Sequence, residues 1–219
     1  MAGSGDALLV GLGRAALPAV AQRLAADGYR VLALREADEA PGAFDDIAAL
    51  LHARAPGFRP DAVVIAAAAP APAPGGVDAV AVAALMDALD GTLATAGLVA
   101  KSLFAAAPPH PARAVVMLDW AVTSTPGRTA ASAVMGGLLG LARSWALEFA
   151  PRGVTTNAVV VGPDVDGARD PAEEAWLVRR PTADDAAHAV AFFLDPRSSA
   201  ITGQVLLVCG GRTAGRLTI

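Results

Sequence analysis

The chain has 219 residues, a length that suits one domain with a single core, and we expect residues 1–219 to form it. The formal net charge of -4 offers no basic face for a phosphate backbone, which argues against a nucleic-acid partner. Hydrophobic residues make up 54% of the chain, but no uncharged stretch reaches the roughly 18 residues that a membrane span needs, so we expect no membrane partner.

Short aliphatic runs alternate along the chain with longer alanine-rich stretches of helical period. In chain order, the predicted strands are residues 7–12, 30–35, 61–68, 112–118, 154–161 and 204–210. The predicted helices lie at about 15–27, 44–54, 78–105, 130–150 and 183–194. This alternation is typical of an α/β fold, in which helices cover both faces of a doubly wound parallel sheet in three αβα layers.

Four stretches of the chain carry a resemblance to a known family. They are "VGLGRAALPAVAQRLAADGYRVLAL", "DAVVIAAA", "GLLGLARSWALEFAPRGVTTNAV" and "TADDAAHAVAFFLDPRSSAITGQVLLVCGG". In their order and content the chain resembles a short-chain dehydrogenase/reductase of the kind that reduces β-ketoacyl groups. The resemblance implies a Rossmann-like fold, although residues 36–60 contain one clear helix where the family usually fits a further strand and helix. The third strand and its helix are therefore expected to be shortened or missing, which leaves the second strand at a sheet edge.

The family's nucleotide site depends on a glycine-rich turn at a helix N-terminus. Here Gly11 matches the first glycine, Leu17 stands at the third, and Gly13 offers a shifted turn. Arg35 matches a position where some members hold the 2′-phosphate of NADP, and residues 65–68 replace the family's Asn-Asn-Ala-Gly with Ile-Ala-Ala-Ala. We therefore expect no bound cofactor, with NADPH held by Gly11, Gly13 and Arg35 as the alternative.

The resemblance also implies a catalytic Tyr, Lys and Ser with a structural Asn. The aligned positions hold Ala131, Met135, Asp119 and Ala88 in that order, and a shift of one residue would bring Ser132 in place of Ala131. None of these side chains can replace a tyrosine whose pKa is lowered by a neighbouring lysine. The sequence therefore predicts that these four family positions carry no catalytic residue.

Composition leads to the same expectation without an alignment. The chain has one tyrosine, Tyr29, and one lysine, Lys101. Tyr29 enters the second strand, at the end of a parallel sheet opposite the ligand crevice. Two alternatives stay open for Asp119 at the end of its strand: a new acid–base role, or hydrogen bonds to the local backbone. The histidines lack partners at ligand spacing, so no metal site is expected.

The resemblance implies that the long helices near 85–105 and 130–150 pair between subunits, as they do in the family. Their apolar surface suggests a chain that has lost its chemistry and is retained as a subunit. The interpretation is an inactive ketoreductase-like pseudoenzyme in a hetero-oligomer with an active paralogue, or with itself, through these helices. The alternatives are an NAD(P)H-dependent ketoacyl reductase with non-standard residues and a sensor of nucleotide or acyl ligands. A lone Cys209, no basic leader and an alanine-rich composition suggest a cytoplasmic, bacterial protein.

Overall fold

The structure is a computed structural model of the full chain. It describes residues 5–12, 17–35, 38–39, 42–69, 81–105, 112–123, 126–162, 177 and 179–213. Gly13, which the sequence offered as a shifted turn, lies outside these residues, as do His110, Ser124 and residues 163–176.

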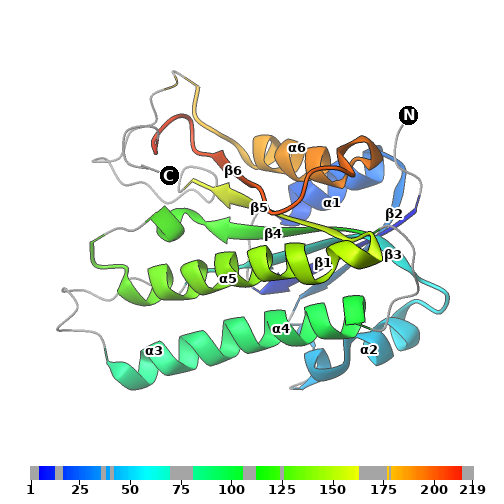
Figure 1. The fold of residues 1–219 in the computed structure, drawn as a ribbon, viewed down its shortest axis with the longest axis horizontal. Coiled ribbons are helices and arrows are strands. Elements are labelled where there is room, and N and C mark those ends of the chain that lie inside the picture. Colours follow the sequence, from blue (N-terminus) through cyan, green and yellow to red (C-terminus); the bar gives the residue numbers. More distant parts are fainter. Residues whose placement is uncertain are drawn as a thin grey trace.

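Six parallel strands form one sheet in the order β2-β1-β3-β4-β5-β6 (Figure 1). The strands are β1 Gly5–Leu12, β2 Tyr29–Arg35, β3 Pro60–Ala67, β4 Arg113–Asp119, β5 Thr155–Val161 and β6 Val205–Val208. The central strands are buried almost throughout because both faces of a parallel sheet are covered, which explains the aliphatic runs AVVML in β4 and AVVV in β5. The order reverses between β1 and β3, and in such sheets ligands bind beyond the carboxyl ends of the strands at this point.

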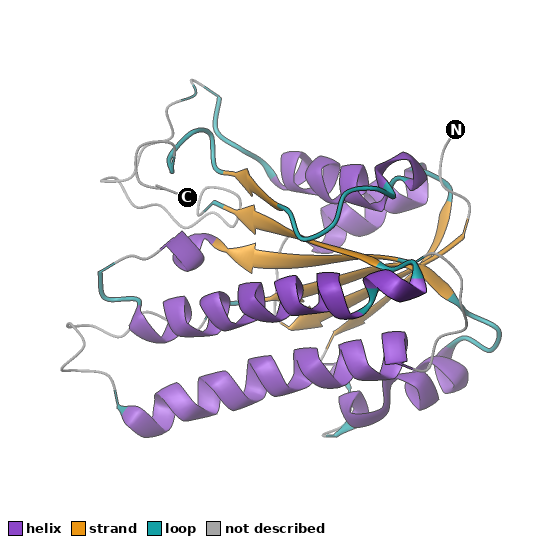
Figure 2. Cartoon of the chain, viewed as in Figure 1, coloured by secondary structure: helices purple, strands orange, loops and turns teal. Residues whose placement is uncertain are grey.

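Helices cover both faces of the sheet (Figure 2). The helices are α1 Leu17–Ala26, α2 Ile47–Arg54, α3 Val82–Leu89, α4 Thr95–Ala100, α5 Thr129–Glu148 and α6 Ala183–Leu194. One apolar cluster joins α1 and α6 to one face, and a larger cluster joins α2, α4 and α5 to the other. The three-layer αβα arrangement expected from the sequence is therefore confirmed.

The helix expected at 78–105 differs in detail from the structure. It begins at Val82, and one π-helical segment, η4 (Asp90–Ala94), interrupts its α-helical hydrogen bonding; a second, η5 (Lys101–Ala105), follows α4 at the end of the described helix. The last strand is also shorter than expected and covers only Val205–Val208. Both differences concern the ends or local winding of elements, which hydrophobic periodicity does not define.

The expected loss of a strand is confirmed at the β2 edge. Between β2 and β3 the described residues contain α2 and a short 3₁₀ segment, Ala43–Asp46, and no strand. β2 pairs only with β1 and so ends the sheet.

Two helical stretches, Val82–Phe104 and Thr129–Glu148, are long and apolar enough to cross a membrane by length and composition alone. The second packs on the sheet over much of its length, whereas the first has little buried surface. Figure 1 shows the two stretches running side by side over one face of the sheet. The absence of a membrane partner remains a prediction.

Candidate functional site

Asp119 is the last residue of β4, at the carboxyl edge where the fold places its ligand crevice. Its side chain is nearly buried, and its Oδ1 accepts a hydrogen bond of 2.8 Å from the backbone N–H of Ala121. The Nη2 of Arg128 lies 3.6 Å from the same oxygen. These contacts fix the carboxylate to the following turn and to a cation, as expected for a local structural role.

A tryptophan flanked by two arginines lies beside Asp119, and this cluster was not predicted from the sequence. The guanidinium carbon of Arg128 lies 5.3 Å from the centre of the Trp120 ring, and that of Arg212 lies 5.9 Å from it. Such cation–π contacts stabilise arginines that are partly removed from water. Arg212 follows β6, more than 90 residues after Trp120, so no local pattern could have predicted the contact.

The family positions on α5 are occupied by apolar side chains that belong to the core. Ala131 and Met135 are buried, and the Met135 sulfur accepts a hydrogen bond of 3.3 Å from the backbone N–H of Asp119. Ser132 donates its hydroxyl proton to the carbonyl oxygen of Ala121 at 2.9 Å. Ala88, on α3, packs at the margin of the larger cluster. Apart from Asp119 and Ser132, whose polar groups bond to the turn after β4, this set offers no group that could transfer a proton.

Tyr29 and Lys101 lie far from this crevice. The Tyr29 hydroxyl donates a buried hydrogen bond of 3.1 Å to the carbonyl oxygen of Leu194, at the amino end of the sheet. Lys101 is exposed in η5, where the long helix reaches the same end (Figure 1). The structure therefore does not bring the single tyrosine and the single lysine to the Asp119 site.

The turn after β1 is the place where a nicotinamide dinucleotide would meet the backbone in this fold. A Cβ built on Gly11 would lie 2.3 Å from Leu17 Cδ1, so the Leu17 side chain occupies the space over this glycine. Leu17 is only 4% exposed. An isobutyl group therefore fills the space over Gly11, where the family's glycine lets a pyrophosphate approach, while the turn residues 13–16 lie outside the described part of the chain.

The neighbouring positions give a dinucleotide little more support. Ile65, Ala66 and Ala67 at the end of β3 are buried and apolar, so they offer no side-chain hydrogen bond. Arg35 pairs with Asp38 at 3.3 Å, and both side chains are about 60% exposed. Such an exposed pair is the usual state of a surface arginine and gives no sign of a phosphate site.

The described residues contain no group of three His, Cys, Asp or Glu side chains that could hold a metal ion. Cys209, after β6, is buried, and its sulfur lies 3.3 Å from the hydroxyl of Thr213.

Comparison with known proteins gives consistent matches. Residues 58–213 match a family model described as enoyl-(acyl carrier protein) reductase. Subunit BbsC of the (2S)-[(R)-hydroxy(phenyl)methyl]succinyl-CoA dehydrogenase of Thauera aromatica is 34% identical over 98% of this chain and 87% of its own length. Subunit BbsD of the same enzyme is 36% identical over 40% of this chain and 39% of its own length. The 3-oxoacyl-[acyl-carrier-protein] reductase FabG of Rickettsia bellii is 39% identical over 41% of each chain.

Solved structures agree with these matches. An oxidoreductase of Burkholderia thailandensis, described as a member of the short chain dehydrogenase/reductase family, superposes with a TM-score of 0.79 at 26% identity, covering 98% of this chain and 94% of its own. A Beutenbergia cavernae protein described as a putative NAD(P)-dependent gluconate 5-dehydrogenase, with bound NADP, shares the fold with a TM-score of 0.80 at 24% identity, covering 97% and 98% of the two chains.

Proposed function

Since the chain belongs to the short-chain dehydrogenase/reductase family, we propose that it is a subunit without chemistry of its own, which pairs with a catalytically competent paralogue and supports it. In this proposal the partner binds NAD(P)H and transfers hydride, and the present chain binds no nucleotide. The structural contacts of Asp119 and the Leu17 side chain over Gly11 support a chain that has no chemistry of its own and binds no nucleotide. The exposed face of α3 is the observation that supports pairing with a partner.

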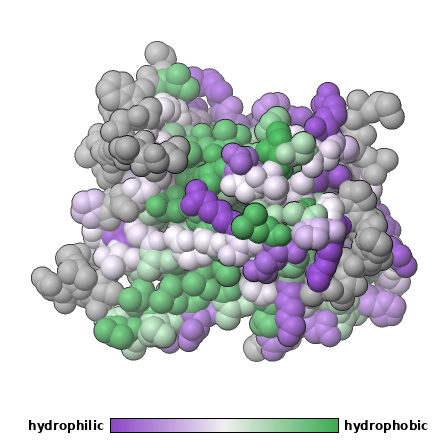
Figure 3. All heavy atoms as spheres, viewed as in Figure 1, coloured by the Kyte–Doolittle hydropathy of each residue, from purple (hydrophilic) through white to green (hydrophobic). Residues whose placement is uncertain are grey.

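Helix α3 has an apolar sequence, VAALMDAL, and none of its residues is buried. Val82 is 74% exposed and Met86 48% exposed. Figure 3 shows hydrophobic residues gathered over α3 at the lower left of this face. A helix that leaves large apolar side chains such as Val82 and Met86 exposed is typical of a subunit interface, because soluble monomers rarely leave such patches open.

Helix α5 runs beside α3 and continues this face. A Cβ built on Gly136 or Gly140 would meet no atom within 4 Å, so these positions are open to close approach by another helix. Gly137 is different, because a Cβ there would lie 2.8 Å from Leu93 Cδ1, within the same chain. One glycine of α5 thus serves the chain's own helix packing, and two leave room on the α3–α5 face, the surface formed by the exposed residues of α3 and α5.

The relatives support a partner from the same family. BbsC and BbsD are both named as subunits of one dehydrogenase, and this chain matches both. BbsC matches over nearly the whole chain, and we place the present protein in the corresponding position beside a BbsD-like partner. The acyl-CoA or acyl-carrier substrates of the relatives suggest an acyl thioester for the complex.

Co-expression with a paralogue from the same genome that keeps Tyr and Lys four residues apart tests this proposal. We expect the two chains to purify together, with ketoreductase turnover that the chain alone lacks. Met86→Asp places a charge on the α3–α5 face and should separate the pair. Phe192→Asp is the matched control, because Phe192 is also 48% exposed but lies on α6, across the sheet.

Three outcomes would overturn the proposal. The first is a chain that stays monomeric and leaves the paralogue's yield and turnover unchanged. The second is equal disruption by both variants, which would remove α3 from the interface. The third is turnover by the chain alone with NADPH or NADH, which would make it an enzyme with altered catalysis.

A further inference from the structure

A pocket of about 330 Å³ opens at the amino end of the sheet, away from the Asp119 site. It lies between α2, the turn at 55–59 and the π-helical segment η5. Its volume is at the lower limit of those that hold small organic ligands. None of the residues discussed for nucleotide binding or for catalysis lines it.

The inner wall of the pocket is apolar. Leu51 and Phe58 are buried there, and Leu103 is half-buried beside them. Leu103 and the neighbouring Ser102 belong to η5, which lies beside α2. This wall would cover a hydrocarbon or aromatic group of a ligand.

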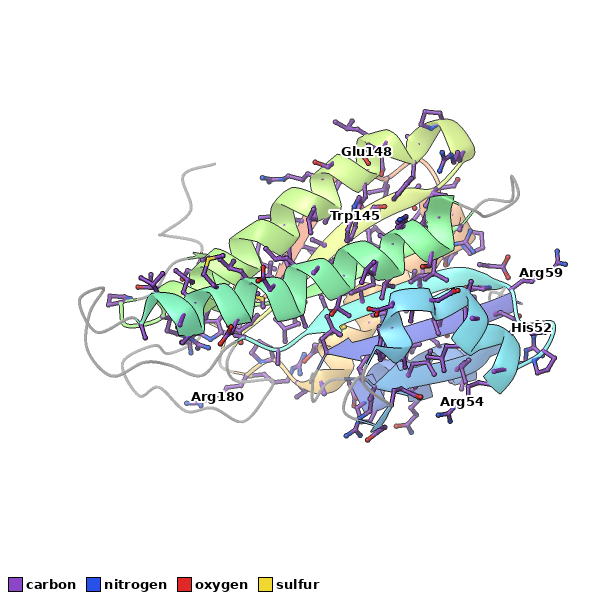
Figure 4. The ribbon with its side chains drawn as sticks, turned by 90° about the horizontal axis from the view of Figure 1, so that it is seen from below. His52, Arg54, Arg59, Trp145, Glu148 and Arg180 are labelled. Atoms are coloured by element: carbon purple, nitrogen blue, oxygen red, sulfur yellow. The ribbon has the colours of Figure 1, made fainter. Side chains whose placement is uncertain are left out.

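The rim of the pocket carries a histidine and an arginine. Figure 4 shows His52 and Arg59 at the same end of the molecule, and both side chains are exposed. Among the described residues neither side chain has a hydrogen-bond or ion-pair partner, although the Arg59 backbone N–H binds Asp6. Three nearby acids already have partners: Asp6 pairs with Arg30 at 2.6 Å, Glu39 pairs with Arg54 at 2.7 Å, and Asp61 accepts a hydrogen bond of 3.1 Å from the Asp6 backbone N–H.

The Arg59 guanidinium, which has no acidic partner among the described residues, favours a negatively charged ligand. We propose that this pocket binds a small organic carboxylate with an apolar body. The Arg59 guanidinium and the His52 ring hold the carboxylate, and Leu51, Phe58 and Leu103 cover the body. The carboxylate of such a ligand accepts charge-assisted hydrogen bonds, which are the stronger kind.

Calorimetric titration of the purified chain with 3-phenylpropionate tests the site. We expect saturable binding with a Kd below roughly 1 mM. The uncharged 3-phenylpropionamide, which has the same body, and inorganic phosphate, which has none, should each bind at least about ten-fold more weakly. Equal binding of the amide would exclude a role for the Arg59 guanidinium and the His52 ring. Equal binding of phosphate would reduce the site to a non-specific anion contact.

Arg59→Gln should weaken 3-phenylpropionate about ten-fold without loss of folding, because the side chain is exposed and the backbone bond to Asp6 remains. Arg54→Gln is the matched control: it removes a neighbouring arginine that pairs with Glu39 and does not line the pocket. Equal effects of the two variants, or no saturable binding to the unaltered chain, would overturn the proposal. The test needs no partner chain, so its result is independent of the proposed subunit function.

Discussion

The Leu17 side chain fills the space over Gly11, and a double-mutant cycle can measure the coupling between these two positions. Gly11→Ala places a methyl group 2.3 Å from Leu17 Cδ1, so a buried side chain must move, which costs about 1–3 kcal/mol of unfolding free energy. Leu17→Ala removes a buried isobutyl group and costs about 2–5 kcal/mol. In the double variant the new methyl enters space that Leu17 has left. We expect its cost to fall short of the sum by about 1 kcal/mol or more.

Urea unfolding followed by circular dichroism, at one protein concentration, gives the four free energies of the cycle. Gly97→Ala is the control for the added methyl, because a Cβ at Gly97 meets no atom within 4 Å. Its effect should add to that of Leu17→Ala within about 0.5 kcal/mol. Strict additivity of Gly11→Ala and Leu17→Ala would refute the reasoning, since the two positions would then not share the space over the turn.

Three further predictions concern single side chains. Tyr29→Phe should lower the free energy of unfolding by about 0.5–1.5 kcal/mol, because the hydrogen bond to Leu194 is lost, and should leave the turnover of the proposed complex unchanged; a large loss of turnover would contradict a structural role. Asp119→Ala leaves a buried backbone N–H without its acceptor and should cost about 1–3 kcal/mol, again with turnover unchanged. The Arg179 guanidinium holds the pKa of Asp185 well below its usual range, so the carboxylate stabilises the fold above the unfolded pKa of about 3.9 and loses that effect as the pH falls further. Asp185→Asn should therefore lower Tm at pH 7, and the difference from the unaltered chain should shrink below about pH 4; a difference independent of pH would exclude the ion pair as its cause.

Most of the fold could be predicted because its causes are local. The aliphatic runs that became β3, β4 and β5 differ from the expected strands by one residue at their ends. The short stretch after β2 correctly predicted a missing strand. The winding of the long helix could not be predicted, because π-helical hydrogen bonds at Asp90–Ala94 and Lys101–Ala105 leave no mark in the hydrophobic period.

The lack of a Tyr–Lys pair at the crevice could be predicted from the sequence, whereas the contacts around Asp119 could not. Counting one tyrosine and one lysine was sufficient to expect no Tyr–Lys pair at the crevice, and the structure places both residues elsewhere. The contacts of Trp120 with Arg128 and Arg212 depend on the approach of segments that are distant in the sequence. The pocket between α2 and η5 could not be predicted for the same reason, because these segments meet only in the folded chain.

The position of β2 at the end of the sheet has a consequence for handling the protein. No strand of the described residues pairs with its outer edge, and such edges promote aggregation unless charged side chains interrupt them. Arg30 and Arg35 are exposed near the two ends of β2, while the stretch between them, VLAL, carries no charge. We expect the two arginines to oppose association through this edge, so replacing both with threonine should increase light scattering during refolding.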